Sequence, residues 1–421
     1  MFEDRLNDGL NFIDLFAGAG GLSEGFIQAG YNPIAHVEMM PHAAETLRTR
    51  AAYHYLKHRG AAMHWYYEYE RGDITREELW NHVPSIVKDS IINREMSEDN
   101  LAEIFRQIDD LMKEYGIHTV DLVIGGPPCQ AYSLAGRGRR DMSDDPRNEL
   151  YKLYAGFLNY YKPKMFVFEN VAGITSAKGG DVFEALKRKL DEVGYSFEAK
   201  EQNARKFGAL QNRRRMIIIG WRKDSEGFYP NFPEEEADAI VNDLLWDLPP
   251  LHPGEKANIN YRCDLSDASE YLRKSGLRTE NDVLTEHEAR NNKPSDIEIY
   301  GIALKQWYDG HKRLHYDELP ERLQSHKNRT SFKDRFKVVE GDEHASHTIL
   351  AHLSKDGHYF IHPDVNQCRS ITVREAARIQ SFPDSYFFEG NRTSQFVQIG
   401  NAVPPMMAKR IAMELKEQLI K

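Results

Sequence analysis

The sequence predicts an α/β fold: a doubly wound, Rossmann-like parallel sheet joined to a second, smaller domain. Three observations support this. Strand-like and helix-like segments alternate from the start of the chain to about residue 222, which is typical of a parallel sheet covered by helices. Glycine-rich or proline-rich turns directly follow two of the strand-like runs. From about 230 to 365 the alternation is lost, and prolines and polar residues dominate.

Length and composition fit a globular protein of two domains. The chain has 421 residues, of which 41% are hydrophobic and 29% charged, enough for two cores. Because there is no signal-like start and no apolar run long enough to cross a bilayer, we expect a cytoplasmic protein with no membrane partner. Three cysteines without a Cys-x-x-Cys pair argue against a disulfide framework and a zinc ribbon, and we expect no metal.

The first strand-like run, Asn11 to Phe16, leads into Ala-Gly-Ala-Gly-Gly and then a helix-like stretch. Glycines at such a joint let a ligand approach the N–H groups of the helix. Gly18 and Gly20 lack the third glycine of a pyrophosphate cradle. Glu38 ends the next strand-like run, where an acid can bind ribose hydroxyls. The pattern favours a nucleoside ligand without a phosphate.

An insertion at about 45–115 dilutes the alternation with charged, helix-like sequence. Apolar residues recur there at helical spacing between Leu101 and Met112, with Ser97 as a cap and Gly116 as a stop. This spacing predicts a helix that packs against the sheet just before the next strand.

That next strand, Val120 to Ile124, runs into Gly-Gly-Pro-Pro-Cys-Gln. The prolines stiffen the turn, so the thiol of Cys129 is presented as a nucleophile once a positive charge lowers its pKa from about 8.5. A lone cysteine is more often a small buried hydrophobe; the turn and the rest of the chain favour the nucleophile. Residues 134–148 are rich in glycine and arginine, which predicts a loop able to close beside Cys129.

Charged side chains follow two further strand-like runs. Glu169 ends the run 164–168, and strand ends of an α/β sheet face the ligand crevice. Arg213 and Arg215 stand two apart at the start of a strand-like run, so we expect both on one face, where they could bind oxygens and lower the thiol pKa, with Arg214 on the other face. A solvated acid and a solvated charge run are the alternatives.

Taken together, these motifs resemble those of the DNA (cytosine-5)-methyltransferase family, in the same order and over nearly the whole chain. The matching segments are 12–21, Glu38 with 72–75, 126–130, 168–171, 211–215, 369–383 and 398–405. The resemblance implies S-adenosylmethionine as cofactor. It also implies methyl transfer to C5 of a flipped-out cytosine in a specific double-stranded DNA site, through a thiolate adduct at C6.

The resemblance assigns roles to individual residues. The catalytic residues would be Cys129, Glu169, Arg213 and Arg215, with Arg215 the base contact and Arg213 the support. Cofactor-binding residues, with Glu38 at the ribose and Asp73 at the adenine, would be Asp14, Phe16, Gly18, Gly20, Glu38, Met39, Asp73, Ile74, Pro128, Leu150 and Asn401. DNA-binding residues near the catalytic turn would be Gln130, Ser133, Arg137, Arg139 and Arg140.

A net charge of −10 argues against nucleic-acid binding, but affinity depends on local basic surface rather than on the sum. Residues 311–337 hold eight Lys or Arg against four acids, with aromatic residues interleaved. We expect this basic stretch to anchor DNA phosphates through Lys333, Arg335 and Lys337.

The resemblance also implies a division of the chain and a set of partners. We expect a catalytic domain at 1–228, a target-recognition domain at 229–365, and a return segment at 366–421 that completes the first domain. The protein would act as a monomer on DNA in a restriction–modification system with a cognate restriction endonuclease.

Three alternatives stand beside this reading. An amino-methyltransferase would carry Asn- or Asp-Pro-Pro-aromatic at the turn, and this chain has Gly-Pro-Pro-Cys. A non-catalytic DNA-binding relative should lack Cys129, Glu169 or the arginines. An RNA cytosine-5 methyltransferase is closer, but the long, basic segment at 230–365 favours duplex DNA, which is read through its grooves.

Overall fold

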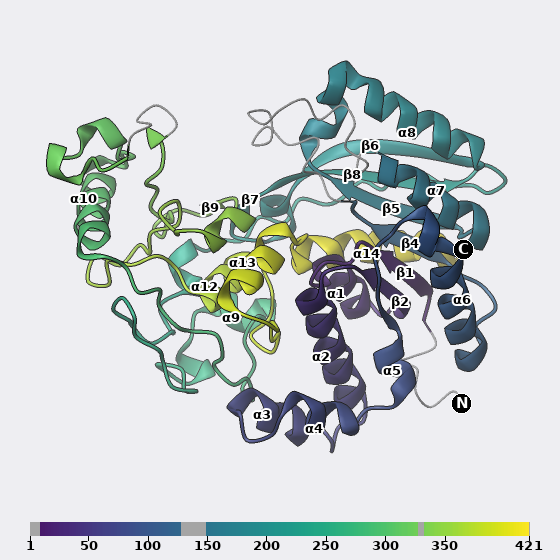
Figure 1. Ribbon diagram of the computed structural model, residues 1–421, viewed down its shortest axis with the longest axis horizontal. Helices are drawn as coiled ribbons and strands as arrows, with labels where there is room; N and C mark the ends of the chain where they lie inside the picture. Colours follow the sequence, from purple (N-terminus) through teal and green to yellow (C-terminus); the bar gives the residue numbers. More distant parts are fainter. Residues whose placement is uncertain (1–8, 128–148, 327–331, 421) are drawn as a thin grey trace.

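The computed structural model of the chain describes residues 9–127, 149–326 and 332–420. Figure 1 shows two lobes. The larger lobe holds a central sheet with helices on both faces, and the smaller lobe holds α10 (Pro294–Gly310) among long irregular segments. The α/β class predicted from the sequence is confirmed.

The central sheet has seven strands in the order β3-β2-β1-β4-β5-β8-β6. The first five positions run parallel, and β8 runs antiparallel to both of its neighbours. The strand order reverses between β1 and β4, so the carboxyl ends of these two strands flank the position where such sheets bind ligands. The bounds are β1 (Asn11–Leu15), β2 (Asn32–Glu38), β3 (Ile91–Asn93), β4 (Leu122–Gly125), β5 (Met165–Asn170), β6 (Tyr195–Asn203) and β8 (Arg214–Arg222).

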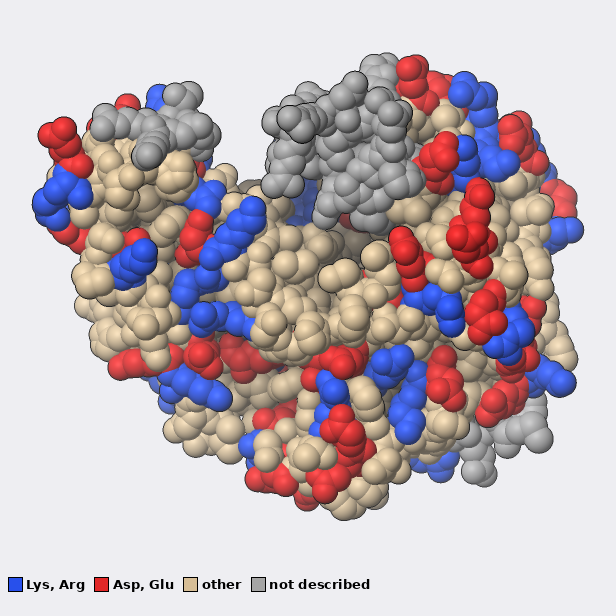
Figure 2. Space-filling view, viewed as in Figure 1, with Lys and Arg blue, Asp and Glu red and all other residues tan. Residues whose placement is uncertain are grey.

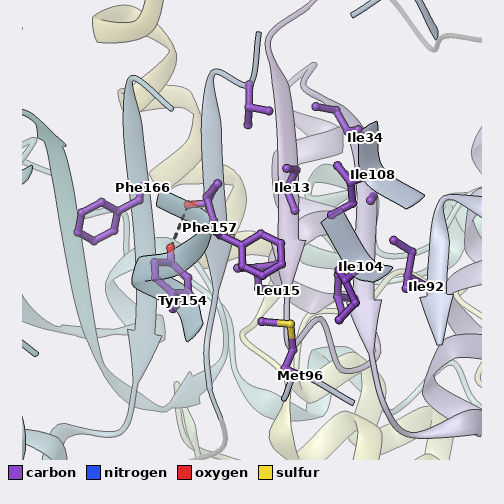
Figure 3. Packing of buried hydrophobic residues seen from close by; sticks show 14 of the residues in the cluster. Ile13, Leu15, Ile34, Ile92, Met96, Ile104, Ile108, Tyr154, Phe157 and Phe166 are labelled. Carbon is purple, nitrogen blue, oxygen red and sulfur yellow. Dashed lines mark hydrogen bonds between the residues drawn. The ribbon is translucent and has the colours of Figure 1, made fainter. Parts of the chain in front are cut away.

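One face of the sheet packs against α6 (Glu98–Tyr115), α7 (Leu150–Tyr161) and α8 (Asp181–Glu192). Figure 3 shows Ile13 of β1 beside Ile104 and Ile108 of α6, with Phe157 of α7 in the same apolar layer. The predicted helix in the insertion is confirmed as α6, which begins after Ser97 and ends at a left-handed Gly116.

The opposite face packs against α1 (Gly21–Gln28) and α14 (Pro405–Ile420). The hydroxyl of Tyr31, just after α1, donates to the carbonyl of Ala412 in α14 at 3.0 Å. Gly25 lies so close to Ala408 that a Cβ there would collide with it. The last helix of the chain therefore packs against the first.

The insertion adds short helices between α2 (Pro41–His58) and β3, namely α3 (His64–Arg71), α4 (Arg76–Asn81) and α5 (Ser85–Asp89). The hydroxyl of Tyr66 in α3 donates to Ser385 O at 2.9 Å, and that of Tyr69 donates to Glu389 Oε1 at 2.7 Å. Helix α3 therefore braces the segment 382–389.

The smaller lobe also contains α9 (Glu270–Ser275), α12 (Val373–Ile379) and α13 (Arg392–Asn401). A two-stranded sheet of β7 (Gln211–Asn212) and β9 (Ser346–His347) joins it to the start of β8. One apolar core unites residues of 239–277 with residues of 373–402, and it also contains Ala19. The return segment therefore contributes α12 and α13 to the smaller lobe and packs α14 against the sheet.

None of the helices within the described ranges is long and apolar enough to span a membrane. Across the same ranges, no three His, Cys, Asp or Glu side chains come together as metal ligands would.

Candidate active site

The glycine-rich turn after β1 forms a loop that leaves open space in front of its backbone. Phe16, Gly18 and Gly20 have φ of 57°, 56° and 79°. A Cβ at Gly20 would lie 2.7 Å from Leu47 Cδ2 and 2.9 Å from Tyr386 Oη, so a larger residue would clash there. Within 9–127, 149–326 and 332–420, and apart from Gly18 and its two chain neighbours, no heavy atom lies within 4 Å of where a Cβ of Gly18 would be. The loop is packed on one side and free to receive a ligand on the other.

Glu38, at the end of β2, organises this loop. Its carboxylate accepts hydrogen bonds from the backbone N–H groups of Gly18 and Met40, both at 2.7 Å. Burial raises the pKa of Glu38 above its usual value, and the backbone donors oppose that rise. Met39 and Met40 are 52% and 53% exposed. An acid and two exposed apolar side chains thus lie together at the loop, a combination that suits a sugar and a flat base.

Asp14 lies in β1, directly below the loop, and is 1% exposed. Burial raises the pKa of Asp14 well above its usual value; a hydrogen bond with the Ser23 hydroxyl opposes the rise and the charge of Glu38 adds to it. Among the residues the structure describes, Asp14 Oδ2 has no hydrogen-bond partner. A ligand with a polar group could satisfy this oxygen.

Asp73 and Ile74, which the resemblance assigned to the cofactor, lie between α3 and α4 and not in the central sheet. Gly72 is the left-handed cap of α3, and Asp73 is exposed in the turn before α4. The strand beside β2 is β3, in which Asn93 pairs with Glu38 and donates from Nδ2 to Glu38 O at 2.8 Å. The residue paired with Glu38 at this end of the sheet is therefore Asn93.

At the other side of the switch point, Glu169 of β5 forms an ion pair with Arg215 of β8. Arg215 Nε lies 2.7 Å from Glu169 Oε1, and both side chains are 12% exposed. Burial raises the pKa of Glu169, and the charges of Arg215 and Arg213 oppose that rise. A Cβ at Gly126 would lie 2.6 Å from Glu169 Oε2. The turn that leads toward Cys129 therefore starts in contact with this carboxyl group.

Arg213 does not share a crevice face with Arg215, and the expectation that both guanidinium groups face the ligand is wrong. Arg213 is fully buried. Its guanidinium donates to Ile349 O at 2.7 Å and to Gly400 O at 2.9 Å. The alternation fails because β7 ends at Asn212 and β8 begins at Arg214, so no continuous strand runs through residue 213. Arg213 therefore joins the start of β8 to two segments of the smaller lobe, at Ile349 and at Gly400 of α13.

The remaining predicted site residues fall into two groups. Leu150 begins α7, and Asn401 is the exposed last residue of α13, next to the carbonyl that Arg213 binds. The others, among them the predicted nucleophile, lie outside the described residues: Pro128, Cys129, Gln130, Ser133, Arg137, Arg139 and Arg140.

In the basic stretch, two of the three predicted phosphate contacts have acidic partners. Arg335 forms an ion pair with Asp356, and Lys337 Nζ lies 2.8 Å from Glu340 Oε1. Lys333 is exposed. Counting charges within 311–337 missed these acids because both lie further along the chain.

The two lobes enclose a hollow that is open at the top of Figure 2, beside the lobe that carries α10. Strands β7 and β9 and the start of β8 lie where the lobes meet (Figure 1). Because Arg215 is the second residue of β8, the Arg215–Glu169 pair lies at the sheet side of this junction.

The sequence is similar to known proteins over nearly its full length. The family model of the C-5 cytosine-specific DNA methylases matches residues 10–59 and 93–417. Type II methyltransferase M.Bpa9945I of Bacillus paralicheniformis is 40% identical, over 96% of this chain and 98% of the relative. Type II methyltransferase M1.HphI of Haemophilus parahaemolyticus is 30% identical, over 96% of this chain and 86% of the relative.

Solved structures resemble the fold. A protein described as a DNA modification methyltransferase encoded within a prophage of E. coli has a TM-score of 0.66 at 23% identity, covering 98% of this chain and all (100%) of that one. The family match leaves out 60–92, the segment that contains α3, α4 and α5 and the first residues of β3.

Proposed function

This chain belongs to the C-5 cytosine-specific DNA methylases, and from that premise we propose that it modifies one specific double-stranded DNA sequence in a restriction–modification system. The enzyme is a DNA (cytosine-5)-methyltransferase. The observation that supports the site assignment best is the buried Glu169–Arg215 pair, in contact with the turn that leads toward Cys129.

S-adenosylmethionine fits the residues around the glycine-rich loop. Gly18 offers open space, Asp14 an unsatisfied carboxyl oxygen, and Glu38 an acid beside two exposed methionines. When bound, this cofactor would supply an electrophilic methyl group to C5 of the cytosine, with breakage of the bond between methyl and sulfur and S-adenosylhomocysteine as the leaving group. Beside these residues we assign Phe16, Gly20, Met39, Pro128, Leu150 and Asn401 to it, and Asn93 in place of Asp73 and Ile74.

The chemistry on the base follows from the catalytic residues. Cytosine C5 is too weak a nucleophile alone, so the thiolate of Cys129 first adds to C6, and the displaced electron pair moves to N3. Glu169 delivers a proton to N3 as that charge develops, because its raised pKa keeps it protonated more readily than an exposed acid. Arg215 holds the carboxyl group and the base oxygen O2. After C5 has taken the methyl group, N3 returns its proton to Glu169. Loss of the C5 proton to a water molecule acting as base then expels the thiolate and restores the ring.

The hollow between the lobes is the proposed DNA site. Because C6 is inaccessible to a thiol inside the base stack, the target cytosine must be extruded from the duplex, at a cost of a few kcal/mol. The smaller lobe would read the sequence through base edges in the grooves. An RNA substrate is the alternative that the experiment below must exclude.

Replacing Cys129 by Ser tests this mechanism. A hydroxyl is far less nucleophilic than a thiolate at neutral pH, so transfer of labelled methyl to DNA should be abolished while cofactor and DNA binding survive. Cys263→Ser is the control, because Cys263 is a half-buried free thiol that we place outside the active site. Transfer by Cys129→Ser at near the wild-type rate, or a clear preference of the wild type for RNA, would contradict the proposal.

A further inference from the structure

Tyr386 connects the smaller lobe to the cofactor loop. We propose that Tyr386 is a positioning residue that holds the glycine-rich loop (residues 17–21) in the shape that receives S-adenosylmethionine. The inference rests on the proposed cofactor site. It adds a residue from a part of the chain 367 positions away from the loop.

The contact is a single hydrogen bond between buried groups. The hydroxyl of Tyr386 donates to the carbonyl of Ala19, and the tyrosine is 1% exposed. No other donor to that carbonyl is found in the described part of the chain. Burial also raises the pKa of Tyr386, so its hydroxyl remains a donor at any physiological pH.

The ring of Tyr386 is packed against two phenylalanine rings and one guanidinium group. It packs against Phe382 and Phe388 at centroid distances of 4.7 and 5.1 Å. The guanidinium carbon of Arg50 lies 4.6 Å from the ring centroid. Such packing fixes the ring, and with it the position of the hydroxyl.

Arg50 links the same ring to the helix that follows the loop. Its guanidinium donates to Glu24, at 2.9 Å from Nε and 2.7 Å from Nη2, and to Ser385 O at 2.8 Å. Glu24 lies in the first turn of α1, directly after the loop. The loop is thus held twice, at Ala19 by Tyr386 and at the start of α1 through Glu24 and Arg50.

The loop needs such support because three of its five residues are glycines, which lose more conformational freedom on ordering than other residues do. Gly20 is packed against the Tyr386 hydroxyl, whereas Gly18 faces open space. Removing the hydroxyl should loosen the loop and reduce cofactor affinity without altering the groups that perform the chemistry.

Tyr386→Phe keeps the ring and removes only the donor. By calorimetry, the Kd for S-adenosylmethionine should rise roughly 5- to 20-fold, the effect of one buried hydrogen bond. The KM for the cofactor should rise with it, while kcat at saturating cofactor stays near the wild-type value. Without ligand, hydrogen exchange at 17–21 should be faster than in the wild type.

Tyr31→Phe is the matched control, because Tyr31 is an equally buried tyrosine whose hydroxyl donates to the Ala412 carbonyl rather than to the loop. Tyr31→Phe should lose about as much unfolding free energy as Tyr386→Phe. It should keep the wild-type Kd for the cofactor and the wild-type rate of hydrogen exchange at 17–21. If Tyr386→Phe behaves like Tyr31→Phe in both measurements, the positioning role is wrong. Failure of the wild type to bind the cofactor would instead overturn the proposed cofactor site, and the exchange comparison would still decide the role of Tyr386.

Discussion

Two arginines, two positions apart in the sequence, serve the site in different ways. Arg215 remains 12% exposed and pairs with Glu169, whereas Arg213 is fully buried and donates to two backbone carbonyls. From the sequence both arginines were expected on one face of a strand. Their different burial could not be predicted, because the break between β7 and β8 depends on the pairing of β7 with β9. Family resemblance nevertheless distinguished a base contact from a support residue, and their burial agrees with that distinction.

The two substitutions Arg213→Met and Arg215→Met should therefore have opposite effects. Arg213→Met leaves two carbonyl groups buried and unsatisfied, so the protein should lose about 2–5 kcal/mol of stability, seen as a lower Tm. Arg215→Met should leave Tm nearly unchanged but lower kcat by about 100-fold, because the carboxyl group of Glu169 and the base oxygen O2 lose the side chain that holds them in place. Arg214→Met, at a side chain 71% exposed, should alter neither. A stable but inactive Arg213→Met would contradict this assignment.

At the level of elements, helices with caps could be predicted and short strands could not. Helix α6 has apolar residues at regular spacing between Ser97 and Gly116, and both ends were found. Strand β3 has only three residues, too few for a pattern, so the sequence did not reveal it, and the resemblance placed the adenine contact at the motif 72–75 instead. A glycine followed by an acid also ends a helix, as Gly72 does for α3.

The net charge of one segment does not show how many of its basic side chains are free to bind phosphate, because acids in other segments can pair with them. Arg335 and Lys337 are paired with acids of the smaller lobe, and Lys333 is exposed. We still propose all three as phosphate contacts, with Lys333 the strongest, because its charge lies at the surface.

Lys333→Ala should weaken binding to every duplex and reduce the salt dependence by about one unit of slope, the value for one phosphate contact. Lys337→Ala should have a smaller effect, because part of its charge is already neutralised by Glu340. Fluorescence anisotropy across a salt series, on a methylatable duplex and on an unrelated one, measures both. A change in which sites become methylated would show that the stretch reads bases instead.

For the molecule as a whole, buried charges join segments of the smaller lobe that lie far apart in the sequence, and no local pattern reveals them. Arg378 of α12 forms ion pairs with Asp247 at 2.5 Å and with Asp384 at 2.6 Å, and all three side chains are fully buried. The sequence suggested boundaries near 229 and 365 from composition, and these remain proposals. Composition could not show that residues of 239–277 share a core with residues of 373–402, because this contact arises only in the folded chain.

Stability should depend on pH through His36, a buried residue of β2. Burial lowers the pKa of His36 to about 4, below the value of about 6.5 in an unfolded chain. The unfolded state therefore binds the proton first. The contribution of neutral His36 to the free energy of unfolding is complete above about pH 6.5 and is lost as the pH falls toward 4. Between pH 7.5 and 5 this amounts to about 2 kcal/mol.

His36→Phe keeps a ring in place and cannot be charged. In urea titrations, wild type should lose about 2 kcal/mol more unfolding free energy than this variant between pH 7.5 and 5. His42→Gln, at an exposed position, should follow the wild type. Equal pH dependence of wild type and His36→Phe would show that His36 does not remain neutral in the fold.

The central claim is that the chain methylates C5 of cytosine at one DNA sequence through Cys129. Bisulfite sequencing of genomic DNA from cells that express the wild type or Cys129→Ser tests it most directly. Wild type should protect one cytosine in every occurrence of a single short sequence from conversion, and Cys129→Ser should protect none. Complete conversion with the wild type, or the same protected sites with both proteins, would contradict the account.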